Sequence, residues 1–485
     1  MTKLIARFAA MAHQRPQQIA LITERSQMTR RDILAMLHVI DTQLAARGVR
    51  PGQTVILDSA RAEFTVVFAL LLSLRGLRVV FSPVAAVLEG GIAFDWAVGP
   101  EPMLALPPER QIIMDAGWFA GLAAVEPPDY RDAAGPEGAF VNRTSGSTGR
   151  PKFVLSTEGQ QLDRLETRHS FFAARMEDRR VAITTSPSNV WGLTAALSVL
   201  VLGGSVVMLT DESARVLGYV DLYRADAMLA TPALLSQIVT LPDAAQFLTG
   251  LRDIRVGGAL LAQSLITSLA AITPARLHLG YGASEIGLIF GFVYDRDNPQ
   301  PEGYLGRCLN DQITVTLHAE DGTPLPDDAP QGTVGVRVND PALRRRYLRP
   351  TDAGASDTPD EQDEMFFPGD VLRRDATGYH FVGRTRNIVN FGGDKYSLDL
   401  IAAHLYAVFQ GRMVVPLVET DAQGIEGLVL VSAGIEPVDE KRAQEALRER
   451  FGNARVLRCE TVHEIPMTDT GKVDSIRLRA LMRGH

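Results

Sequence analysis

The chain has 485 residues, of which 46% are hydrophobic and 22% charged, and its formal net charge at pH 7 is −8. The composition is that of an ordinary soluble globular protein, and the length predicts at least two domains. The acidic balance gives no electrostatic reason to bind nucleic acid or an anionic membrane, so neither is expected as a partner. The two cysteines, Cys308 and Cys459, have no CxxC spacing. This favours free thiols in the cytoplasm over a disulfide or a metal site.

The first predicted elements alternate between helix and strand. A helix is expected over residues 64–74 and a strand over 77–81, with Arg75-Gly76 breaking the chain between them. Alternation of this kind indicates α/β units on a largely parallel sheet. The segment from Met1 to Phe8 lacks the longer apolar core of a signal peptide, so none is expected.

A run of nine residues, Thr144-Ser-Gly-Ser-Thr-Gly-Arg-Pro-Lys152, comes next and is rich in hydroxyls and glycine. Glycines bring backbone N–H groups close to an anion, hydroxyls donate to phosphate oxygens, and Lys152 adds a positive charge. The spacing differs from a Walker A loop, because no Gly-Lys-Ser/Thr follows. The run therefore predicts a polyphosphate-binding loop, and a solvated turn of the same residue types is the alternative.

Residues 181–210 contain no charged side chain, and a run of this length could span a membrane as a helix. Pro187 and Gly192 interrupt its start, however, and Gly203-Gly204 splits its end. A buried helix, a glycine turn and a buried parallel strand over 205–209 are expected in place of a membrane span.

The following residues predict a strand over 227–230 and then a helix from 233 to about 239. Thr231 is placed to cap this helix and Pro232 to open it. Residues 254–258 predict a strand that runs into a glycine turn. The polar, acidic segment 351–364 predicts a surface loop.

The last hundred or so residues are enough for a domain of their own. Their expected elements are strands over 413–417, 427–432 and 454–459 and a charged helix over 437–451. They predict a separate small α+β domain, whose boundary falls near residues 383–386.

Four further clusters follow the hydroxyl-rich loop in order. They are Gly257-Gly-Ala259, Gly280-Tyr-Gly-Ala-Ser-Glu285, Phe367-Pro-Gly-Asp370 with Gly383-Arg384, and Pro466-Met-Thr-Asp-Thr-Gly-Lys472. With the loop, they resemble the motifs of the adenylate-forming superfamily, which holds acyl- and aryl-CoA ligases, adenylation domains of nonribosomal peptide synthesis, and luciferase. The resemblance covers nearly the whole chain. Each cluster alone is a weak signal, and their common order makes the match specific.

The resemblance implies an α/β protein with a large N-terminal domain, residues 1–383, of mostly parallel sheets and flanking helices. A hinge at 384–386 would join it to a small, mobile α+β C-terminal domain, residues 387–485. In the family this domain swings between two half-reactions. The hinge position is Arg386, where the family usually has Asp or Lys, and the loop 390–395 would enter the site beside a pantetheine arm.

The activity implied is the ATP-dependent activation of a carboxylic acid, with release of pyrophosphate, followed by transfer of the acyl group to a thiol of CoA or of a carrier-protein phosphopantetheine. ATP and Mg²⁺ are the expected cofactors. Lys472 matches the adenylation lysine, since a cation there can stabilise charge on carboxylate and phosphate together. Glu285 matches the Mg²⁺-associated carboxylate and Ser284 a phosphate-contacting hydroxyl. The alternatives are a solvated surface lysine and a glutamate at a helix N-terminus.

Other matches concern the nucleotide. Tyr281 and the 257–259 turn would flank adenine, Asp370 would accept from the ribose hydroxyls, and Arg384 would contact ribose or phosphate. Core packing, a capping aspartate and an interdomain salt bridge are the competing roles. The residues assigned to ATP are Thr144, Ser145, Gly146, Ser147, Thr148, Gly149, Lys152, Gly257, Gly258, Ala259, Tyr281, Gly282, Asp370 and Arg384.

The sequence departs from the family at several positions. Phe153 follows Lys152 where glycine is common, and Arg143 stands where an aromatic is common. The glutamates usual after the hinge motif are replaced by Leu400 and Ala402. Adenylation is still expected in spite of these differences. The identity of the thiol acceptor is less well defined by the sequence.

The acid pocket is assigned to Asn189, Trp191, Gly192 and Gly280. Residues 181–204 contain no carboxylate that could hold a substrate ammonium, and a buried unpaired ammonium costs several kcal/mol. An aryl acid is therefore expected first and an aliphatic acid second. Asn189 could contact a ring hydroxyl or simply cap the backbone. An amino-acid adenylation protein and a catalytically silent binding relative are the alternative functions.

Overall fold

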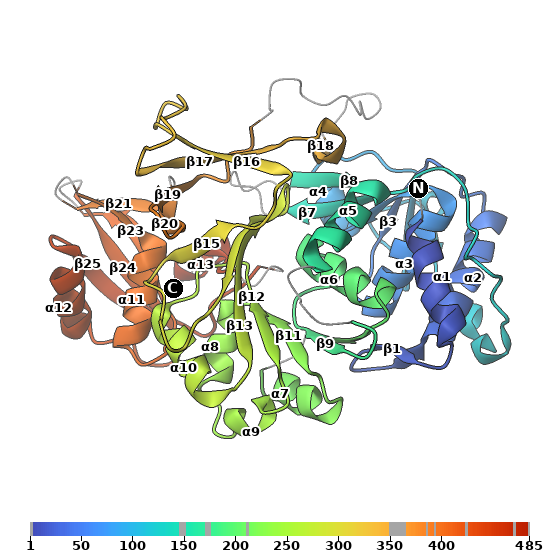
Figure 1. Cartoon of the computed structure of the whole chain (residues 1–485), viewed down its shortest axis with the longest axis horizontal. Helices are drawn as coiled ribbons and strands as arrows, with labels where there is room; N and C mark the ends of the chain where they lie inside the picture. The colour runs from blue at the N-terminus through green and yellow to red at the C-terminus, as the bar shows by residue number, and fades with distance from the viewer. Residues whose placement is uncertain are drawn as a thin grey trace.

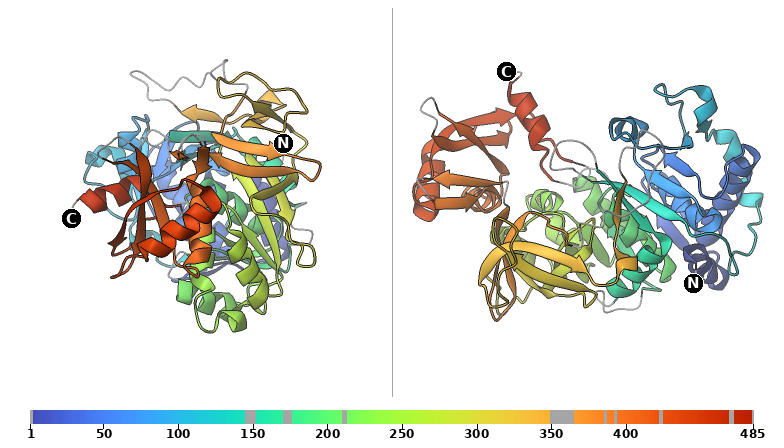
Figure 2. Two further views of the ribbon diagram at one scale, coloured as in Figure 1. Left: turned by 90° about the vertical axis from the view of Figure 1, so that its left-hand side faces the viewer. Right: turned by 90° about the horizontal axis from the view of Figure 1, so that it is seen from above.

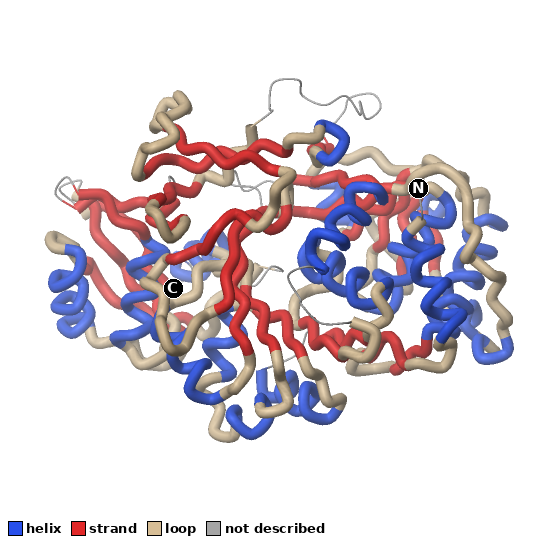
Figure 3. The backbone as a smooth tube through the Cα atoms, in the orientation of Figure 1, coloured by secondary structure: helices blue, strands red, loops and turns tan. Residues whose placement is uncertain are grey.

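The computed structural model describes residues 3–144, 152–169, 176–209, 213–348, 365–384, 387–391, 394–421, 425–468 and 472–483. The described strands form sheets of thirteen, seven, three and two strands (Figure 1). Figure 3 shows the helices gathered around these strands. None of the helices within those ranges has both the length and the apolar character that crossing a bilayer requires.

The seven-stranded sheet has the order β18-β8-β7-β4-β3-β5-β6. Its pairs from β7 to β6 are parallel, whereas β7 with β8 and β8 with β18 are antiparallel. The strands are β3 (Thr54–Leu57), β4 (Arg78–Phe81), β5 (Trp96–Gly99), β6 (Gln111–Ile113), β7 (Ala139–Thr144), β8 (Lys152–Thr157) and β18 (Arg346–Leu348).

The thirteen-stranded sheet has the order β16-β17-β19-β20-β15-β14-β13-β12-β11-β9-β10-β1-β2. Pairing is parallel from β13 to β1 and antiparallel elsewhere. Its strands are β1 (Ile19–Ile22), β2 (Gln27–Thr29), β9 (Arg180–Ile183), β10 (Ser205–Met208), β11 (Ala227–Ala230), β12 (Asp253–Val256), β13 (Arg276–Ala283), β14 (Gly287–Val293), β15 (Tyr304–Cys308), β16 (Ile313–His318), β17 (Gln331–Val338), β19 (Asp370–Arg374) and β20 (Tyr379–Arg384).

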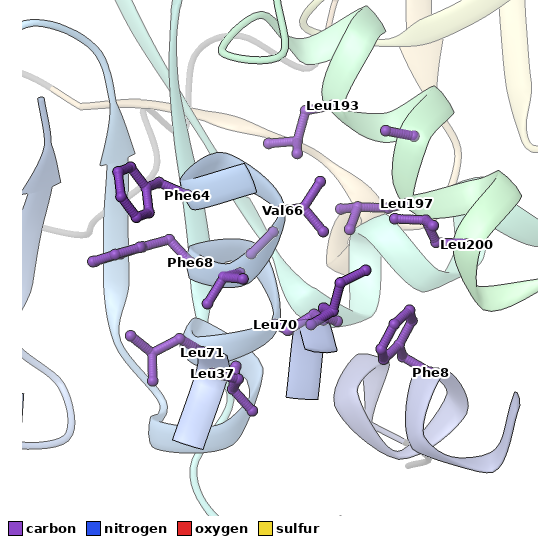
Figure 4. Close-up of a cluster of buried hydrophobic side chains, with 14 of the residues drawn as sticks. Phe8, Leu37, Phe64, Val66, Phe68, Leu70, Leu71, Leu193, Leu197 and Leu200 are labelled. Carbon is purple, nitrogen blue, oxygen red and sulfur yellow. The ribbon is translucent and has the colours of Figure 1, made fainter. Parts of the chain in front are cut away.

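Five helices contribute to the largest core, which they share with strands of both large sheets. They are α1 (Leu4–Gln14), α2 (Arg30–Ala46), α3 (Ala62–Arg75), α5 (Glu158–His169) and α6 (Val190–Val201). Figure 4 shows side chains of α3 and α6 facing one another in this core. α3 is apolar nearly all round, as a fully buried helix must be. Gly76 ends it in the left-handed conformation, with φ of 67°.

Other helices cover the outer faces of the sheets. A second core joins α7–α10 to β9–β12 of the thirteen-stranded sheet, and another joins α4 to β3–β5 and β7 of the seven-stranded sheet. The helices are α4 (Val84–Glu89), α7 (Ser213–Leu222), α8 (Pro232–Ile238), α9 (Ala244–Leu248) and α10 (Gln263–Ile272). The 3₁₀ segments of the described chain are Pro108–Arg110, Ala116–Phe119, Leu122–Ala124 and Pro341–Leu343.

The C-terminal elements build two cores that contain no residue before Val389. They gather at the end of the molecule opposite α1 and α2 (Figure 2). Ala403 and Tyr406 of α11 also pack on the core that α7–α10 form, and Arg450 makes an ion pair with Glu302. The elements are β21 (Ile388–Phe391), β22 (Asp394–Ser397), α11 (Leu398–Val408), β23 (Val414–Thr420), β24 (Glu426–Ala433), α12 (Glu440–Phe451), β25 (Val456–Val462) and α13 (Ser475–Arg483).

The α/β class and most of the expected elements are confirmed. The run 181–210 contains the expected buried helix α6 and the parallel strand β10. Thr231 caps α8 through its side chain, which accepts from the Leu234 amide over 3.4 Å. The expectation of mostly parallel sheets holds where strands alternate with helices. Strands joined by hairpins pair antiparallel, because parallel strands need a long crossover.

Three elements in the C-terminal part have bounds that differ from the prediction. The strand expected over 413–417 occupies Val414–Thr420. The helix expected from residue 437 begins at Glu440, because the side chain of Asp439 caps it by accepting from the Arg442 amide over 2.8 Å. The last strand occupies Val456–Val462 in place of 454–459. The acidic segment 351–364 lies outside the described residues.

Candidate active site

The hydroxyl-rich loop connects two antiparallel strands. Thr144 ends β7 directly opposite Lys152, which begins β8. Ser145, Gly146, Ser147, Thr148 and Gly149 lie outside the described residues. Lys152 is exposed, and its ammonium lies 5.4 Å from the centre of the Tyr347 ring. Both ends of the loop are thus held on neighbouring strands of the seven-stranded sheet.

A second hairpin, between β13 and β14, presents Ser284 and Glu285. Their turn is tight, because a Cβ on Gly282 would lie 2.1 Å from the Gly287 carbonyl oxygen. Gly287 has a φ of 104°, which glycine adopts readily. Glu285 therefore stands on a hairpin turn. The alternative of a glutamate at a helix N-terminus is wrong.

This turn is contacted by Arg345, which directly precedes β18, and by Tyr347 of β18, and the sequence motifs indicated neither contact. The Tyr347 hydroxyl donates to Glu285 Oε1 over 2.6 Å, and the Arg345 guanidinium donates to the Ser284 carbonyl. Burial lowers the pKa of Arg345 to about 9. From the other side, Arg164 of α5 donates to the Ile286 carbonyl over 2.7 Å. The turn is therefore braced by side chains from two separate elements.

Asp370 is 3% exposed and begins β19. Its Oδ2 accepts from the Tyr281 hydroxyl over 2.5 Å, and its Oδ1 accepts from Arg384 Nε over 3.0 Å. Burial, followed by the Asp370 carboxylate, raises the pKa of Tyr281 well above its ordinary value. Burial opposes the Arg384 cation, but Asp370 and Asp399 outweigh this and raise its pKa. The carboxylate plane is fixed, and each oxygen keeps a lone pair for a further donor.

The rings around Tyr281 complete this part of the site. Phe290 lies 5.6 Å from the Tyr281 ring centre and 4.5 Å from the Tyr379 ring centre. Arg384 of β20 lies directly opposite Asp370 of β19, and the two side chains form an ion pair. This pair lies within the thirteen-stranded sheet.

Gly257 brings α6 and β13 together beside the glycine turn. A Cβ on Gly257 would lie 3.3 Å from the Trp191 ring and 3.4 Å from the Gly280 carbonyl oxygen. The next residue, Gly258, has a φ of 92°, so the turn before Ala259 depends on glycine. Trp191 and Gly280, which were assigned to the acid pocket, thus meet at the turn that was assigned to adenine.

Asn189 caps α6, since its Oδ1 accepts from the Gly192 amide over 2.6 Å. A Cβ on Gly192 would lie 2.4 Å from the Ser186 carbonyl oxygen. Gly192 therefore faces the turn before the helix, where a side chain would not fit. Contact with a ring hydroxyl and capping of the backbone were the two roles considered for Asn189, and the structure shows the second.

Lys472 comes from the far end of the chain and is partly buried. Its amide donates to Thr468 Oγ1 over 3.2 Å, while its carbonyl accepts from the Thr468 amide over 2.7 Å. Burial, followed by the Arg384 charge, lowers the pKa of its ammonium, while Asp370, Asp399 and Glu285 raise it. Lys472 is therefore within electrostatic reach of the turn between β13 and β14 and of the paired strands β19 and β20.

Asp399 is a further member of this cluster that the motifs did not indicate. It lies in the first turn of α11, and burial raises its pKa while Arg384 and Lys472 oppose the shift. It stands next to Leu400, one of the positions where the sequence departs from the family. Arg386, the expected hinge, lies outside the described residues.

A magnesium ion fits the donor set of this region. Within the residues that the structure describes, no three His, Cys, Asp or Glu side chains are grouped as a protein-only metal site requires. Magnesium takes only one or two protein carboxylates and completes its shell with phosphate oxygens and water. Glu285 offers such a carboxylate, whose Oε1 accepts from Tyr347 of β18, the strand that pairs with β8.

Comparisons with known proteins agree with the sequence motifs. Residues 103–348, just over half of the chain, match the family described as AMP-binding enzyme. A 3-hydroxybenzoate–CoA ligase of Aromatoleum sp. (strain CIB) is 28% identical over 73% of this chain and 68% of its own length. Enterobactin synthase component E of Escherichia coli (strain K12) is 25% identical over 99% of this chain and 94% of its own length.

Solved structures share the fold over the whole chain. An anthranilate CoA ligase, AuaEII, in complex with anthranoyl-AMP has a TM-score of 0.81 at 17% identity, covering 99% of this chain and 96% of its own. A benzoate CoA ligase from Burkholderia xenovorans LB400 has a TM-score of 0.79 at 14% identity, covering 99% and 100%. At these identities the likeness concerns the fold.

Proposed function

This chain belongs to the family of AMP-binding enzymes, and on that premise we propose that it is an AMP-forming acid–thiol ligase. In the first half-reaction a carboxylate oxygen bonds to the α-phosphorus of ATP, and the bond to the β-phosphate oxygen breaks to release pyrophosphate. In the second, a thiol attacks the acyl carbon, loses its proton, and displaces AMP. The product is a thioester.

The proposal rests mainly on the charged residues that surround Lys472. Its ammonium, from the end of the chain, shares one electrostatic cluster with Asp370 and Glu285 of the large sheet. The first half-reaction moves negative charge between the carboxylate and the phosphates, and a fixed cation beside both lowers the cost of that movement. Lys472 is the residue for this role, with Asp370 and Tyr281 holding the nucleotide.

We assign the remaining nucleotide contacts to the residues that the motifs indicated. Asp370, held by Tyr281 and Arg384, accepts from the ribose hydroxyls. Thr144 and Lys152 hold the ends of the phosphate loop. Glu285 would hold Mg²⁺, which supplies positive charge against the phosphates when bound. Ser284 contributes its hydroxyl beside it.

An aryl acid is the substrate class that the pocket favours. Gly257 lies against the Trp191 ring and the Gly280 backbone, and residues 181–204 hold no carboxylate for a substrate ammonium. Two relatives are named for aromatic acids, 3-hydroxybenzoate and salicylate. Because Asn189 Oδ1 is engaged in capping α6, we assign the recognition of the acid mainly to ring packing.

The thiol is that of CoA or of a carrier-protein phosphopantetheine, and the cytoplasm is the proposed location. Relatives of both kinds are named, a CoA ligase and an enterobactin synthase component. Hinge motion at residues 384–386 would carry the domain from residue 387 onwards between the two half-reactions. Leu400 and Ala402 follow the hinge in place of the family's glutamates.

The experiment is ATP–pyrophosphate exchange with aryl, fatty and amino acids, followed by thioester detection with CoA and with a phosphopantetheinylated carrier. Exchange with aryl acids is expected, and Lys472→Ala should lower it by roughly 100- to 1,000-fold. Lys441→Ala, on the charged helix α12 of the same part of the chain, is the matched control. Exchange only with amino acids, or none with any acid, contradicts the proposal.

A further inference from the structure

Tyr347 joins two groups that the proposed function assigns to the triphosphate and its metal ion. We propose that Tyr347 is a positioning residue, which sets the Glu285 carboxylate for Mg²⁺ and holds the Lys152 ammonium at the mouth of the phosphate loop. The inference rests on the proposed function and adds to it a residue outside the sequence motifs.

The strand register explains why Tyr347 reaches both groups. Tyr347 of β18 lies opposite Val154 of β8. Side chains two apart on a strand share a face, so Lys152 projects on the same side as Val154 and diagonally to Tyr347. The Lys152 ammonium lies 5.4 Å from the Tyr347 ring centre, a distance at which a cation is attracted to the ring face.

The hydroxyl end of the same ring meets Glu285. It donates to Oε1 over 2.6 Å, which is short, as expected of a bond to a charged acceptor. Glu285 stands on a hairpin turn, where a glutamate side chain otherwise samples several rotamers. The bond to Tyr347 selects one of them, and the backbone of the turn is held by Arg345 through the Ser284 carbonyl.

Tyr347 is 42% exposed, so burial does not account for its aromatic character. A phenol is suited to this place because its ring can face a cation while its hydroxyl donates to a carboxylate. The ring face of Tyr347 thereby holds Lys152, and its hydroxyl end holds Glu285. Their separation stays fixed before any nucleotide arrives, which lowers the cost of ordering them on binding.

The test is calorimetric titration of ATP into the full-length protein, in excess Mg²⁺ and separately in EDTA. Tyr347→Phe keeps the ring and loses the hydroxyl, so we expect MgATP to bind roughly tenfold more weakly while ATP in EDTA binds as before. Tyr347→Leu also removes the ring and should weaken both titrations. Tyr304→Phe, whose hydroxyl donates to the Thr377 carbonyl over 2.9 Å, is the control and should leave both unchanged.

A double variant separates positioning through Glu285 from a general structural effect. In the Glu285→Gln protein, adding Tyr347→Phe should cause no further loss of MgATP affinity. A full additional loss would overturn the inference, and so would a Tyr347→Phe protein that binds MgATP like the unchanged chain. If the unchanged chain binds no MgATP, the proposed function fails as well, so the two failures are distinguishable.

Discussion

The hydroxyl of Tyr281 donates to Oδ2 of Asp370 over 2.5 Å, across 89 residues of sequence. Tyr281 lies on β13 and Asp370 on β19, and three strands separate these two in the order of the sheet. In a flat sheet, four strand spacings would place them about 19 Å apart. The sheet therefore curls strongly between β13 and β19, and this curvature brings Tyr281 to Asp370, the residue to which we assign the ribose hydroxyls.

Replacing Tyr281 by phenylalanine should weaken the nucleotide site without unfolding the protein. The ring still packs on Phe290, but Asp370 loses the donor that fixes its Oδ2. Loss of one hydrogen bond to a carboxylate costs about 1.5–3 kcal/mol, so the KM for ATP in pyrophosphate exchange should rise roughly ten- to hundredfold. The KM for the acid should stay close to that of the unchanged enzyme, and an ATP KM that does not move would count against the role of Asp370.

The pH dependence of adenylation should show the lowered pKa of Lys472. Burial, with Arg384, lowers this pKa below its ordinary value of 10.5. The ammonium is the active form, so the exchange rate should fall as the pH rises through the lowered pKa. Asp399→Asn removes a carboxylate that raises the pKa of Lys472, and the fall should then begin at a lower pH.

Asp421→Asn is the control for this shift, because Asp421 lies in the same part of the chain and pairs with Arg455. Its rate profile should follow that of the unchanged enzyme. If the exchange rate of Asp399→Asn falls over the same pH range as that of the unchanged enzyme, Asp399 does not act on Lys472.

Gly257→Ala tests the pocket. The added Cβ would lie 3.3 Å from the Trp191 ring, so the ring must shift by a few tenths of an ångström. The KM for a flat aryl acid should rise several-fold, while smaller acids are affected less. Gly218→Ala adds a Cβ on α7 with nothing within 4 Å and should leave the acid preference unchanged. Equal effects of Gly257→Ala on all acids would place the acid elsewhere.

Asp253 should stabilise the fold through the buried Arg179. Its Oδ2 accepts from Arg179 over 2.8 Å, and its Oδ1 lies 2.7 Å from His278 Nε2. Asp253→Asn removes the more buried of the two carboxylates that pair with this guanidinium, Asp226 being the other. The loss of a hydrogen bond to a charged group should lower the free energy of unfolding by about 1.5–3 kcal/mol in urea titrations at pH 7. Asp129→Asn breaks the exposed pair with Arg131 and should have no measurable effect.

The Asp253 carboxylate should also make the free energy of unfolding fall at acid pH. Burial alone would raise the pKa of Asp253, but hydrogen bonds from His278 and Arg179 outweigh it and hold the pKa at about 2. Its unfolded pKa is about 3.9. Its contribution is therefore present above about pH 4 and disappears as the pH falls towards 2. The difference between the unchanged chain and Asp253→Asn should shrink over that interval, and a constant difference would contradict the linkage.

Local sequence patterns were enough to predict many of the helices and strands. The uncharged run 181–210 gave its helix and strand because burial on both faces requires continuous apolar residues. Thr231 and Pro232 placed a helix start through their own backbone chemistry. The helix expected from residue 437 begins three residues later, because the side chain of Asp439 caps it.

Tyr347, Arg345 and Asp399 could not be found in this way. None belongs to a glycine-rich or hydroxyl-rich motif, and Tyr347 meets Glu285 only because β18 pairs with β8. Such a contact depends on strand order and sheet curvature, which are properties of pairings between distant segments.

The sequence by itself determined the family motifs, the alternation of helix and strand, and the residue types that a nucleotide and a carboxylate need. Those features are local, because backbone geometry, capping and apolar periodicity act over a few residues. The tertiary structure alone decided which of these side chains meet. It curled the sheet so that Tyr281 reaches Asp370, and it brought Lys472 into the field of Glu285, because long-range packing and charge depend on distances that chain order does not contain.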